Sequence, residues 1–242
     1  MDTERLAEQL VLWIREKVSG VGCKGTVLGM SGGIDSSVLA VLCQRALPQG
    51  TLGLIMPCYS NPEDEEHALA VAGKFSIATE TVVLDSVFDA LLKVLPGEKT
   101  NGPSSPMVQA NLKARLRMLT LYYFANRHQY LVAGGSNRSE LATGYFTKYG
   151  DGGVDILPMG KLVKKEVREL AAFLGIPQEI IDKPPSAGLW PGQTDEEDLG
   201  FSYDELDRYL LTGEAPDRIR EKIEAMRTTA DHKRVPPPSP EF

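Results

Sequence analysis

A glycine-rich run follows the first apolar stretch of this 242-residue chain and constrains its fold more than any other feature. Residues 29–37 read GMSGGIDSS, after the strand-like residues 26–28 and before an amphipathic helix expected over 35–47. A turn from a strand into a helix gathers unpaired backbone N–H groups at the positive end of the helix dipole, which favours a bound phosphate. The sequence therefore predicts an α/β unit with an anion site at the end of its first strand.

The side chains of this run narrow the chemistry. The run lacks the lysine of the GxxxxGK[ST] loop found in phosphoryl-transfer NTPases. It offers instead the hydroxyls of Ser31, Ser36 and Ser37 and the carboxylate of Asp35. Hydroxyls donate hydrogen bonds to phosphate oxygens, and a carboxylate binds Mg²⁺. The structural alternative is a βα turn in which Asp35 and Ser36 only cap the helix.

Apolar stretches alternate with helical patterns along the rest of the chain. We expect strands at 26–30, 51–56, 80–84 and 130–133, and helices at 2–19, 35–47, from 61 onward, 85–95, 106–127, 161–174, 203–212 and 216–229. This alternation predicts an α/β fold, a doubly wound, mostly parallel sheet with helices on both faces, as one domain over 1–242. Ligands of such sheets bind at the carboxyl ends of the strands, so the turns at 31–34 and 134–137 are expected to share one crevice.

Three segments read as irregular structure. Residues 96–106 form a Gly/Pro/Ser loop, and residues 183–200 are rich in Pro and Gly and then acidic, which predicts a long mobile loop. The Pro-rich tail at 235–242 is not expected to form a packed helix.

The bulk composition excludes several classes of protein. A net charge of −7 argues against a nucleic-acid binder. No apolar run reaches the length of a membrane span, and the charged amphipathic start is unlike a secretory signal. The three cysteines form neither a zinc pair nor a disulfide framework. We therefore expect a cytoplasmic protein with no membrane or nucleic-acid partner.

Charged residues near the expected strand ends are candidate ligands. Glu140 follows the fourth strand and is a candidate second carboxylate for a metal ion held by Asp35. Lys148, Asp151 and Asp155 lie in a Gly-rich stretch after the same strand, where charged loop residues are binding candidates. The alternative for this stretch is a solvated loop whose glycines only make turns.

Three further cationic positions each have two interpretations. Arg115 lies beside an apolar helix stripe, where an arginine also snorkels without function. Lys164 lies near a helix start, which disfavours a cation unless an anion is close, so it is a candidate phosphate contact. The HKR triplet at 232–234 is either a basic cap on the last helix or part of a ligand site.

Taken together, these segments resemble the NAD synthetase family. SGGIDSS resembles the pyrophosphate loop of ATP pyrophosphatases, which GMP synthetases, asparagine synthetases and tRNA-modifying ligases share. The segments that are similar to NAD synthetases, in order along nearly the whole chain, are NLKARLRM, GGSNRSE, GYFTKYGDGGVD, KPPSAGLWPGQTDEEDLG and HKR. The resemblance implies a Rossmann-like fold of the adenine nucleotide alpha hydrolase type. It also implies a C–N-forming ligase: ATP adenylates the carboxylate of deamido-NAD, pyrophosphate leaves, and ammonia displaces AMP.

The resemblance also assigns roles to residues. It implies Mg²⁺ binding by Asp35 and Glu140, with Asp35 and Lys164 as catalytic residues. The family often has Thr where Gly135 stands, so a backbone contact to ATP is expected there, with the Ser136 hydroxyl as a replacement. The implied ATP contacts are Gly29, Met30, Ser31, Gly32, Gly33, Ile34, Asp35, Ser36, Gly135, Lys164 and Ser186. The implied deamido-NAD contacts are Arg115, Lys148, Asp155, His232 and Lys233.

Quaternary structure and nitrogen source follow from the same resemblance. It implies a homodimer in which the long helix at 106–127 contributes to the interface. Residues 1–25 leave no room for a glutamine-hydrolysing domain, so free ammonia is the expected donor, unless a separate glutaminase subunit supplies it. Two alternatives stay open: another adenylating ligase, GMP-synthetase-like or tRNA-modifying, and a non-catalytic ATP-binding regulatory module.

Overall fold

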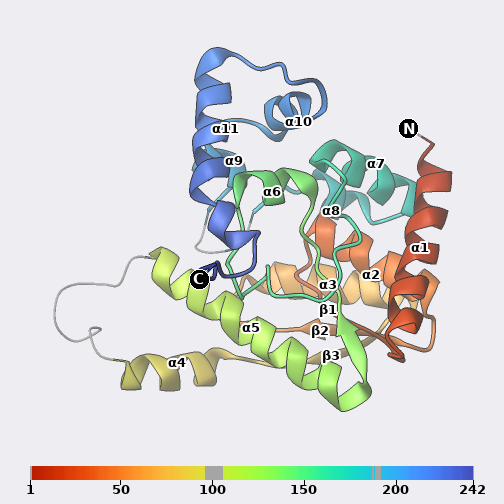
Figure 1. Ribbon diagram of the computed structural model, residues 1–242. Coiled ribbons are helices and arrows are strands. Elements are labelled where there is room, and N and C mark those ends of the chain that lie inside the picture. Colours follow the sequence, from red (N-terminus) through yellow and green to blue (C-terminus); the bar gives the residue numbers. More distant parts are fainter. Residues whose placement is uncertain (1, 96–105, 187, 189–191, 242) are drawn as a thin grey trace.

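A four-stranded parallel sheet forms the centre of the protein in the computed structural model, which describes residues 2–95, 106–186, 188 and 192–241 (Figure 1). The elements of its first half are α1 (Thr3–Gly20), β1 (Gly25–Gly29), α2 (Ile34–Ala46), β2 (Thr51–Ile55), α3 (Pro62–Phe75), β3 (Ala78–Thr81), α4 (Asp85–Val94) and α5 (Pro106–His128). Those of its second half are β4 (Tyr130–Val132), α6 (Arg138–Thr143), α7 (Lys164–Leu174), α8 (Gln178–Asp182), α9 (Asp195–Leu199), α10 (Tyr203–Thr212), α11 (Asp217–Thr229) and a 3₁₀ turn, η1 (Asp231–Lys233).

The strand order β3-β2-β1-β4 creates a switch point beside β1. The chain runs outward from β1 through β2 to β3, and then returns through α4 and α5 to place β4 on the other side of β1. Connections that leave a strand in opposite directions open a crevice at the carboxyl ends of β1 and β4. This arrangement confirms the predicted doubly wound α/β fold and fixes where its ligand site belongs.

Both faces of the sheet are covered by helices because its strands are apolar on both sides. Within β1, Val27 packs toward α4 and α5, whereas Leu28 packs toward α1, α2 and α7, and both are fully buried. Successive strand residues point to opposite faces, so adjacent apolar residues serve two separate cores. Figure 1 shows α5 on one side of the sheet, with α1 and α2 on the other.

A third apolar cluster joins α9, α10 and α11 beside the crevice. Leu199, Phe201, Tyr203, Leu206 and Ile223 are all nearly or fully buried in it. Figure 1 shows α10 and α11, in blue, packed next to α6 and away from the sheet. This layer covers the side of the crevice that α6 and α7 form.

Three short helices differ from the sequence-based expectations. α6 lies in the stretch after the fourth strand, which shows no period in the sequence, and α9 lies inside the loop predicted at 183–200. α8 is also absent from the expected elements. Such helices are too short for an apolar period; side-chain caps stabilise two of them, Asn137 at α6 and Thr194 at α9. The mobile loop predicted at 183–200 includes residues 187 and 189–191, and the loop predicted at 96–106 includes residues 96–105. Residues 96–105, 187 and 189–191 lie outside the described residues.

Two other elements begin two or more residues away from the positions expected from the sequence. β3 covers Ala78–Thr81 rather than 80–84, because pairing with Leu52–Ile55 sets its register. The helix expected from residue 161 begins at Lys164. Over the described parts of the chain, none of the helices has the length and apolar character needed to cross a membrane.

Candidate nucleotide-binding site

The glycine-rich loop is shaped by its own serine hydroxyls. The Ser36 hydroxyl accepts from the backbone N–H of Ser31 (3.2 Å) and donates to the carbonyl of Gly33 (3.0 Å). The Ser31 hydroxyl lies 3.0 Å from that of Ser36 and accepts from the N–H of Gly33 (3.3 Å). α2 begins immediately after Gly33, so this ring of hydrogen bonds lies at the positive end of the α2 dipole. The loop therefore has the shape and position expected of a phosphate cradle.

The remaining loop residues contribute mainly their backbones. Met30 and Ile34 are buried in the apolar core, so their side chains cannot contact a ligand in the crevice. Gly32 has a φ of +75°, and a Cβ there would lie 2.1 Å from the carbonyl oxygen of Asp64 on α3. The ATP contacts predicted for these residues are thus confined to backbone atoms.

Asp35 does not act as a helix cap. It lies in the first turn of α2, and its Oδ1 accepts from Asn137 Nδ2 (2.8 Å) while its Oδ2 pairs with Lys164 Nζ (2.5 Å). Both partners come from beyond β4, which shows that the two predicted turns face one crevice. Gly135 faces the same place, since a Cβ on it would lie 3.8 Å from the Asp35 carbonyl carbon and from the Ser36 nitrogen.

Glu140 completes a buried charged centre. Its Oε1 accepts from Asn137 Nδ2 (2.8 Å) and lies 3.4 Å from Lys164 Nζ. Its Oε2 accepts from the Asn137 N–H, and the Asn137 side chain accepts from the Glu140 N–H in return, which forms a capping box at α6. Asn137 therefore holds Asp35 and Glu140 together, with the 2%-exposed Lys164 as their shared counter-ion.

This geometry shifts the pKa values of the centre. Burial lowers the pKa of Lys164, but the carboxylates of Asp35 and Glu140 outweigh it, so its pKa is raised and the ammonium stays charged. Burial and the nearby Asp35 raise the pKa of Glu140 from 4.5 to about 8, against the opposing effect of Lys164. Lys164 stands at a helix start, which disfavours a cation, and these two carboxylates are the anions that stabilise it there.

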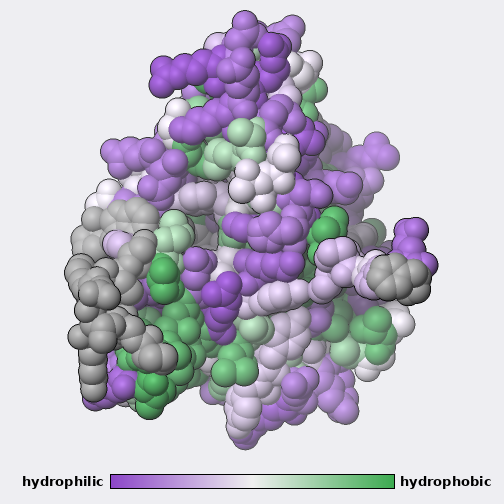
Figure 2. Space-filling view, turned by 60° about the vertical axis from the view of Figure 1, so that its left-hand side comes forward, coloured by the Kyte–Doolittle hydropathy of each residue, from purple (hydrophilic) through white to green (hydrophobic). Residues whose placement is uncertain are grey.

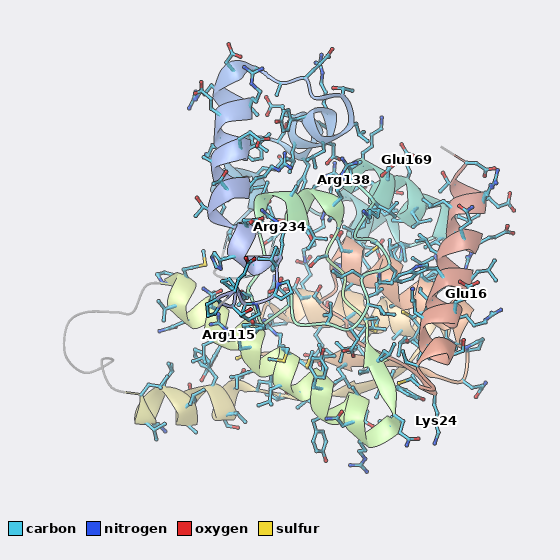
Figure 3. All side chains as sticks on the ribbon, in the orientation of Figure 1. Glu16, Lys24, Arg115, Arg138, Glu169 and Arg234 are labelled. Atoms are coloured by element: carbon cyan, nitrogen blue, oxygen red, sulfur yellow. The ribbon has the colours of Figure 1, made fainter. Side chains whose placement is uncertain are left out.

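We expect Glu140→Gln to flatten the pH dependence of stability. Because the folded-state pKa of Glu140 is raised to about 8, its contribution to stability is complete below pH 4.5 and is lost as the pH rises through 8. Urea unfolding in EDTA at several pH values between 5 and 9 measures this. Glu169→Gln, on the exposed side of α7 (Figure 3), is the matched control and should follow the wild type. Parallel curves for wild type and Glu140→Gln would contradict the expectation.

Residues that the sequence analysis missed surround Lys164. The ammonium lies 4.9 Å from the centre of the Tyr203 ring, and the Tyr203 hydroxyl donates to Asp195 (3.0 Å). Asp207 accepts from Ser139 Oγ (2.5 Å) and from the N–H of Lys165 (2.7 Å), which fixes the starts of α6 and α7. Periodicity gives no sign of these contacts. Only the Asn137-x-x-Glu140 spacing, a capping-box pattern, could have been found beforehand.

A second cluster of cations lies at the other end of α6. Lys233 Nζ donates to the carbonyls of Gly144 (2.8 Å) and Phe146 (2.9 Å), just after α6 ends. Lys148 Nζ donates to the carbonyl of His232 (2.5 Å), and Arg115 donates to the carbonyl of Lys148 (3.2 Å). The structure thus brings together four of the five predicted deamido-NAD residues. The two clusters thus lie toward opposite ends of the six-residue helix α6.

Arg234 behaves differently from its neighbours in the triplet. Its guanidinium donates to the carbonyls of Leu141 and Ala142 at the end of α6, and to that of Arg227 on α11. The basic-cap interpretation therefore applies to Arg234, whereas Lys233 ties the triplet to the loop after α6. Figure 3 labels Arg234, just after η1, and Arg115 on α5.

Asp155 and Ser186 lie apart from these clusters. The Asp155 carboxylate accepts from the N–H of Val132 (2.8 Å) and from the hydroxyl of Tyr122 (3.0 Å), which anchors the Gly-rich loop to β4. The Ser186 hydroxyl accepts from the N–H of Gly188 (3.0 Å). Its segment reaches α3 through Lys183, whose Nζ lies 2.7 Å from Asp64, and Asp64 in turn touches Gly32 of the loop.

The donor atoms of the first cluster fit a magnesium ion shared with phosphates. Among the described residues, no group of three or more His, Cys, Asp and Glu side chains is arranged to hold a metal ion. Mg²⁺ is commonly held by one or two carboxylates together with substrate phosphates, rather than by a cage of protein ligands. Asp35 and Glu140 supply that pair beside the phosphate cradle.

These features define a nucleotide-binding α/β enzyme of the ATP pyrophosphatase class. A glycine- and serine-rich loop without a phosphate-binding lysine ends β1, and acidic residues face it across the switch point. Comparison with known proteins makes the assignment specific. The sequence over residues 6–237 matches the model of the family described as NAD synthase. The chain belongs to this family, which confirms the resemblance found in the sequence.

Individual relatives agree over the full length of the chain. It is 48% identical to the NH(3)-dependent NAD(+) synthetase of Carboxydothermus hydrogenoformans, covering 98% of this chain and 97% of that one. Among solved structures, NMN synthetase from Francisella tularensis has a TM-score of 0.94 at 35% identity, and covers 100% of both chains. The NH3-dependent NAD synthetase from Campylobacter jejuni has a TM-score of 0.82 at 30% identity, also over 100% of both chains.

Proposed function

We propose that this protein makes NAD from deamido-NAD, ATP and ammonia, and releases AMP and pyrophosphate. The observation that carries the proposal is the pair of clusters at the two ends of α6. One offers a phosphate cradle with Asp35, Glu140 and Lys164, and the other offers the cations Arg115 and Lys148. Two anionic nucleotides can therefore be held next to each other. The family membership and the NH(3)-dependent relatives support the same reaction.

The chemistry follows from what these groups can stabilise. An oxygen of the nicotinate carboxylate attacks the α-phosphorus of ATP, the bond to the bridging oxygen breaks, and pyrophosphate leaves with the electron pair. Ammonia then attacks the carbonyl carbon of the adenylate, loses a proton, and expels AMP. The Lys164 ammonium and the N–H groups of the loop stabilise the negative charge on pyrophosphate. Asp35 and Glu140 would hold a Mg²⁺ ion, which would add to the neutralisation of that charge.

One assay separates this reaction from its alternatives. Purified protein is mixed with ATP, Mg²⁺, deamido-NAD and ammonium, and NAD and AMP are measured. Equal amounts of NAD and AMP are expected. Formation of ADP contradicts cleavage between the α and β phosphates. ATP binding without turnover supports the regulatory module, and turnover only with another acceptor supports a different adenylating ligase.

A second candidate substrate is the mononucleotide that lacks the adenylyl half of deamido-NAD. It is favoured by one observation, the TM-score of 0.94 with an NMN synthetase, against 0.82 with the Campylobacter NAD synthetase. The carboxylate that becomes the amide is the same in both substrates, so the first cluster suits either. The ratio of kcat/KM for deamido-NAD and for the deamidated mononucleotide decides between them.

We expect Lys148→Ala to weaken use of the nicotinate nucleotide and to leave ATP binding nearly unchanged. A charged hydrogen bond is worth about 1.5–3 kcal/mol, so KM for that nucleotide should rise by about 10–150-fold. Lys24→Ala is the control, because Lys24 is exposed before β1, at the opposite end of the strands, and lies far from Arg115 in Figure 3. A loss of ATP affinity with unchanged KM for the nucleotide would show that Lys148 is assigned to the wrong ligand.

We further propose that the protein acts as a homodimer in the cytoplasm, where ATP is supplied. Hydrophobic side chains gather on the face formed by α4 and α5 (Figure 2). The exposed ones are Val87, Val94, Met107, Val108, Leu119 and Tyr123. Apolar side chains that gather on one face of a folded protein support an interface with another chain. Sedimentation velocity should give a mass near twice that of the chain.

A further inference from the structure

Lys164 occupies the position between the two carboxylates that a divalent metal ion also needs. Its Nζ lies 2.5 Å from Asp35 Oδ2 and 3.4 Å from Glu140 Oε1. The same two side chains are held side by side by Asn137 Nδ2, at 2.8 Å from each. A metal ion bridging Asp35 and Glu140 would therefore meet the ammonium at close range, and two cations in a buried site repel strongly.

The backbone of Lys164 is fixed, so only its flexible side chain can give way. The N–H of Lys164 donates to Ser139 Oγ (3.1 Å), and the N–H of Lys165 donates to Asp207 (2.7 Å). The Tyr203 ring closes one side of the ammonium at 4.9 Å. Asp35 lies in the first turn of α2, beside the phosphate cradle. Phosphates bound there therefore come within reach of the Lys164 ammonium when its side chain moves.

We infer that the Lys164 ammonium and a divalent metal ion compete for Asp35 and Glu140, and that ATP relieves the competition by drawing Lys164 onto its phosphates. The part that concerns ATP rests on the proposed function. Metal alone then binds weakly, whereas metal and ATP assist each other, and this coupling is reciprocal. Lys164 is thus the residue that makes the metal site depend on the nucleotide.

The test measures metal and nucleotide separately. Mn²⁺ binding without nucleotide is followed by electron paramagnetic resonance in wild type, Lys164→Met and Lys165→Met. We expect Lys164→Met to bind Mn²⁺ about 5–150-fold more tightly than wild type, the range typical of coupled sites. Lys165→Met removes the same charge from an exposed neighbour on α7 and should match the wild type. ATP binding in EDTA should weaken in Lys164→Met by a similar factor.

Opposite changes for metal and nucleotide distinguish competition from a merely structural role. Equal or weaker Mn²⁺ binding by Lys164→Met overturns the inference, as does Mn²⁺ tightening that survives in the Asp35→Asn/Lys164→Met double variant. Lys164→Gln, which still donates to Asp35, replaces Lys164→Met if circular dichroism shows loss of the fold. If neither variant folds, the wild type decides: micromolar Mn²⁺ binding without nucleotide overturns the inference, and millimolar binding supports it. The measurements need neither deamido-NAD nor ammonia, so failure of the amidation reaction is a separate result.

Discussion

Asp35→Asn is expected to lower the rate of AMP formation by about 10²–10³-fold, the loss seen when a positioned charge-stabilising group is removed. Asp35 faces the phosphate cradle and pairs with Lys164 at 2.5 Å. The substitution removes a negative charge from the metal-binding pair and leaves Lys164 poorly positioned for pyrophosphate. Single-turnover measurement of AMP at saturating ATP reports this step directly.

The stability of Asp35→Asn should fall by less than its activity. Breaking a buried ion pair costs about 3–5 kcal/mol when it leaves a charge unpaired. Here Glu140 stays 3.4 Å from Lys164, and the Asn side chain can still accept from Asn137, so a loss of about 1–3 kcal/mol is expected. The sequence alone indicates a smaller cost, because the partners of Asp35 are not visible in it.

Asp217→Asn is the control for this comparison. Asp217 is a first-turn acid too, but it pairs with an exposed Arg220 and is itself 82% exposed. Neither turnover nor stability should change measurably. If Asp35→Asn kept a tenth or more of wild-type turnover with the same loss of stability, Asp35 would be a structural residue only.

The fold and the centre of the site could be predicted because both follow from local patterns. Alternating strands and helices indicate the parallel sheet, and the carboxyl ends of parallel strands meet at one edge. That rule is enough to bring Asp35 and Glu140 into one crevice from their places in the sequence. Arg115 and Lys148 could be assigned to a ligand only through the family resemblance, because neither lies in a sequence pattern that distinguishes it from a solvated residue.

The parts that could not be predicted depend on packing between distant segments. Tyr203 and Asp207 come from α10, which the sequence identifies as an amphipathic helix without showing what it packs against. Asp207 accepts from the backbone N–H of Lys165 at the start of α7 and from the hydroxyl of Ser139 on α6, a contact that spans 68 residues. Ordinary helix periodicity makes such residues look like core or surface positions. Their role appears only when α6, α7 and α10 are seen together.

Gly32→Ala is expected to abolish ATP-dependent turnover and to destabilise the fold. A Cβ at this position would lie 2.1 Å from the Asp64 carbonyl oxygen and 2.9 Å from its carbon, both backbone atoms that cannot rotate away. The φ of +75° adds a further penalty for any residue with a side chain. We expect a loss of about 2–5 kcal/mol, from a left-handed backbone and from overpacking against α3.

Two other glycines make the comparison specific. Gly33 has a φ of −86°, and a Cβ on it would meet only the Ser31 hydroxyl at 3.4 Å, so Gly33→Ala should change stability by no more than about 0.5 kcal/mol. Gly73 lies inside α3, where a Cβ would have nothing within 4 Å, and Gly73→Ala should stabilise by about 0.5–1 kcal/mol. Urea unfolding ranks the three variants, and ATP binding is measured on those that fold. A Gly32→Ala protein as stable as Gly33→Ala, with normal ATP affinity, would mean that the close approach of the loop to α3 does not shape the phosphate cradle.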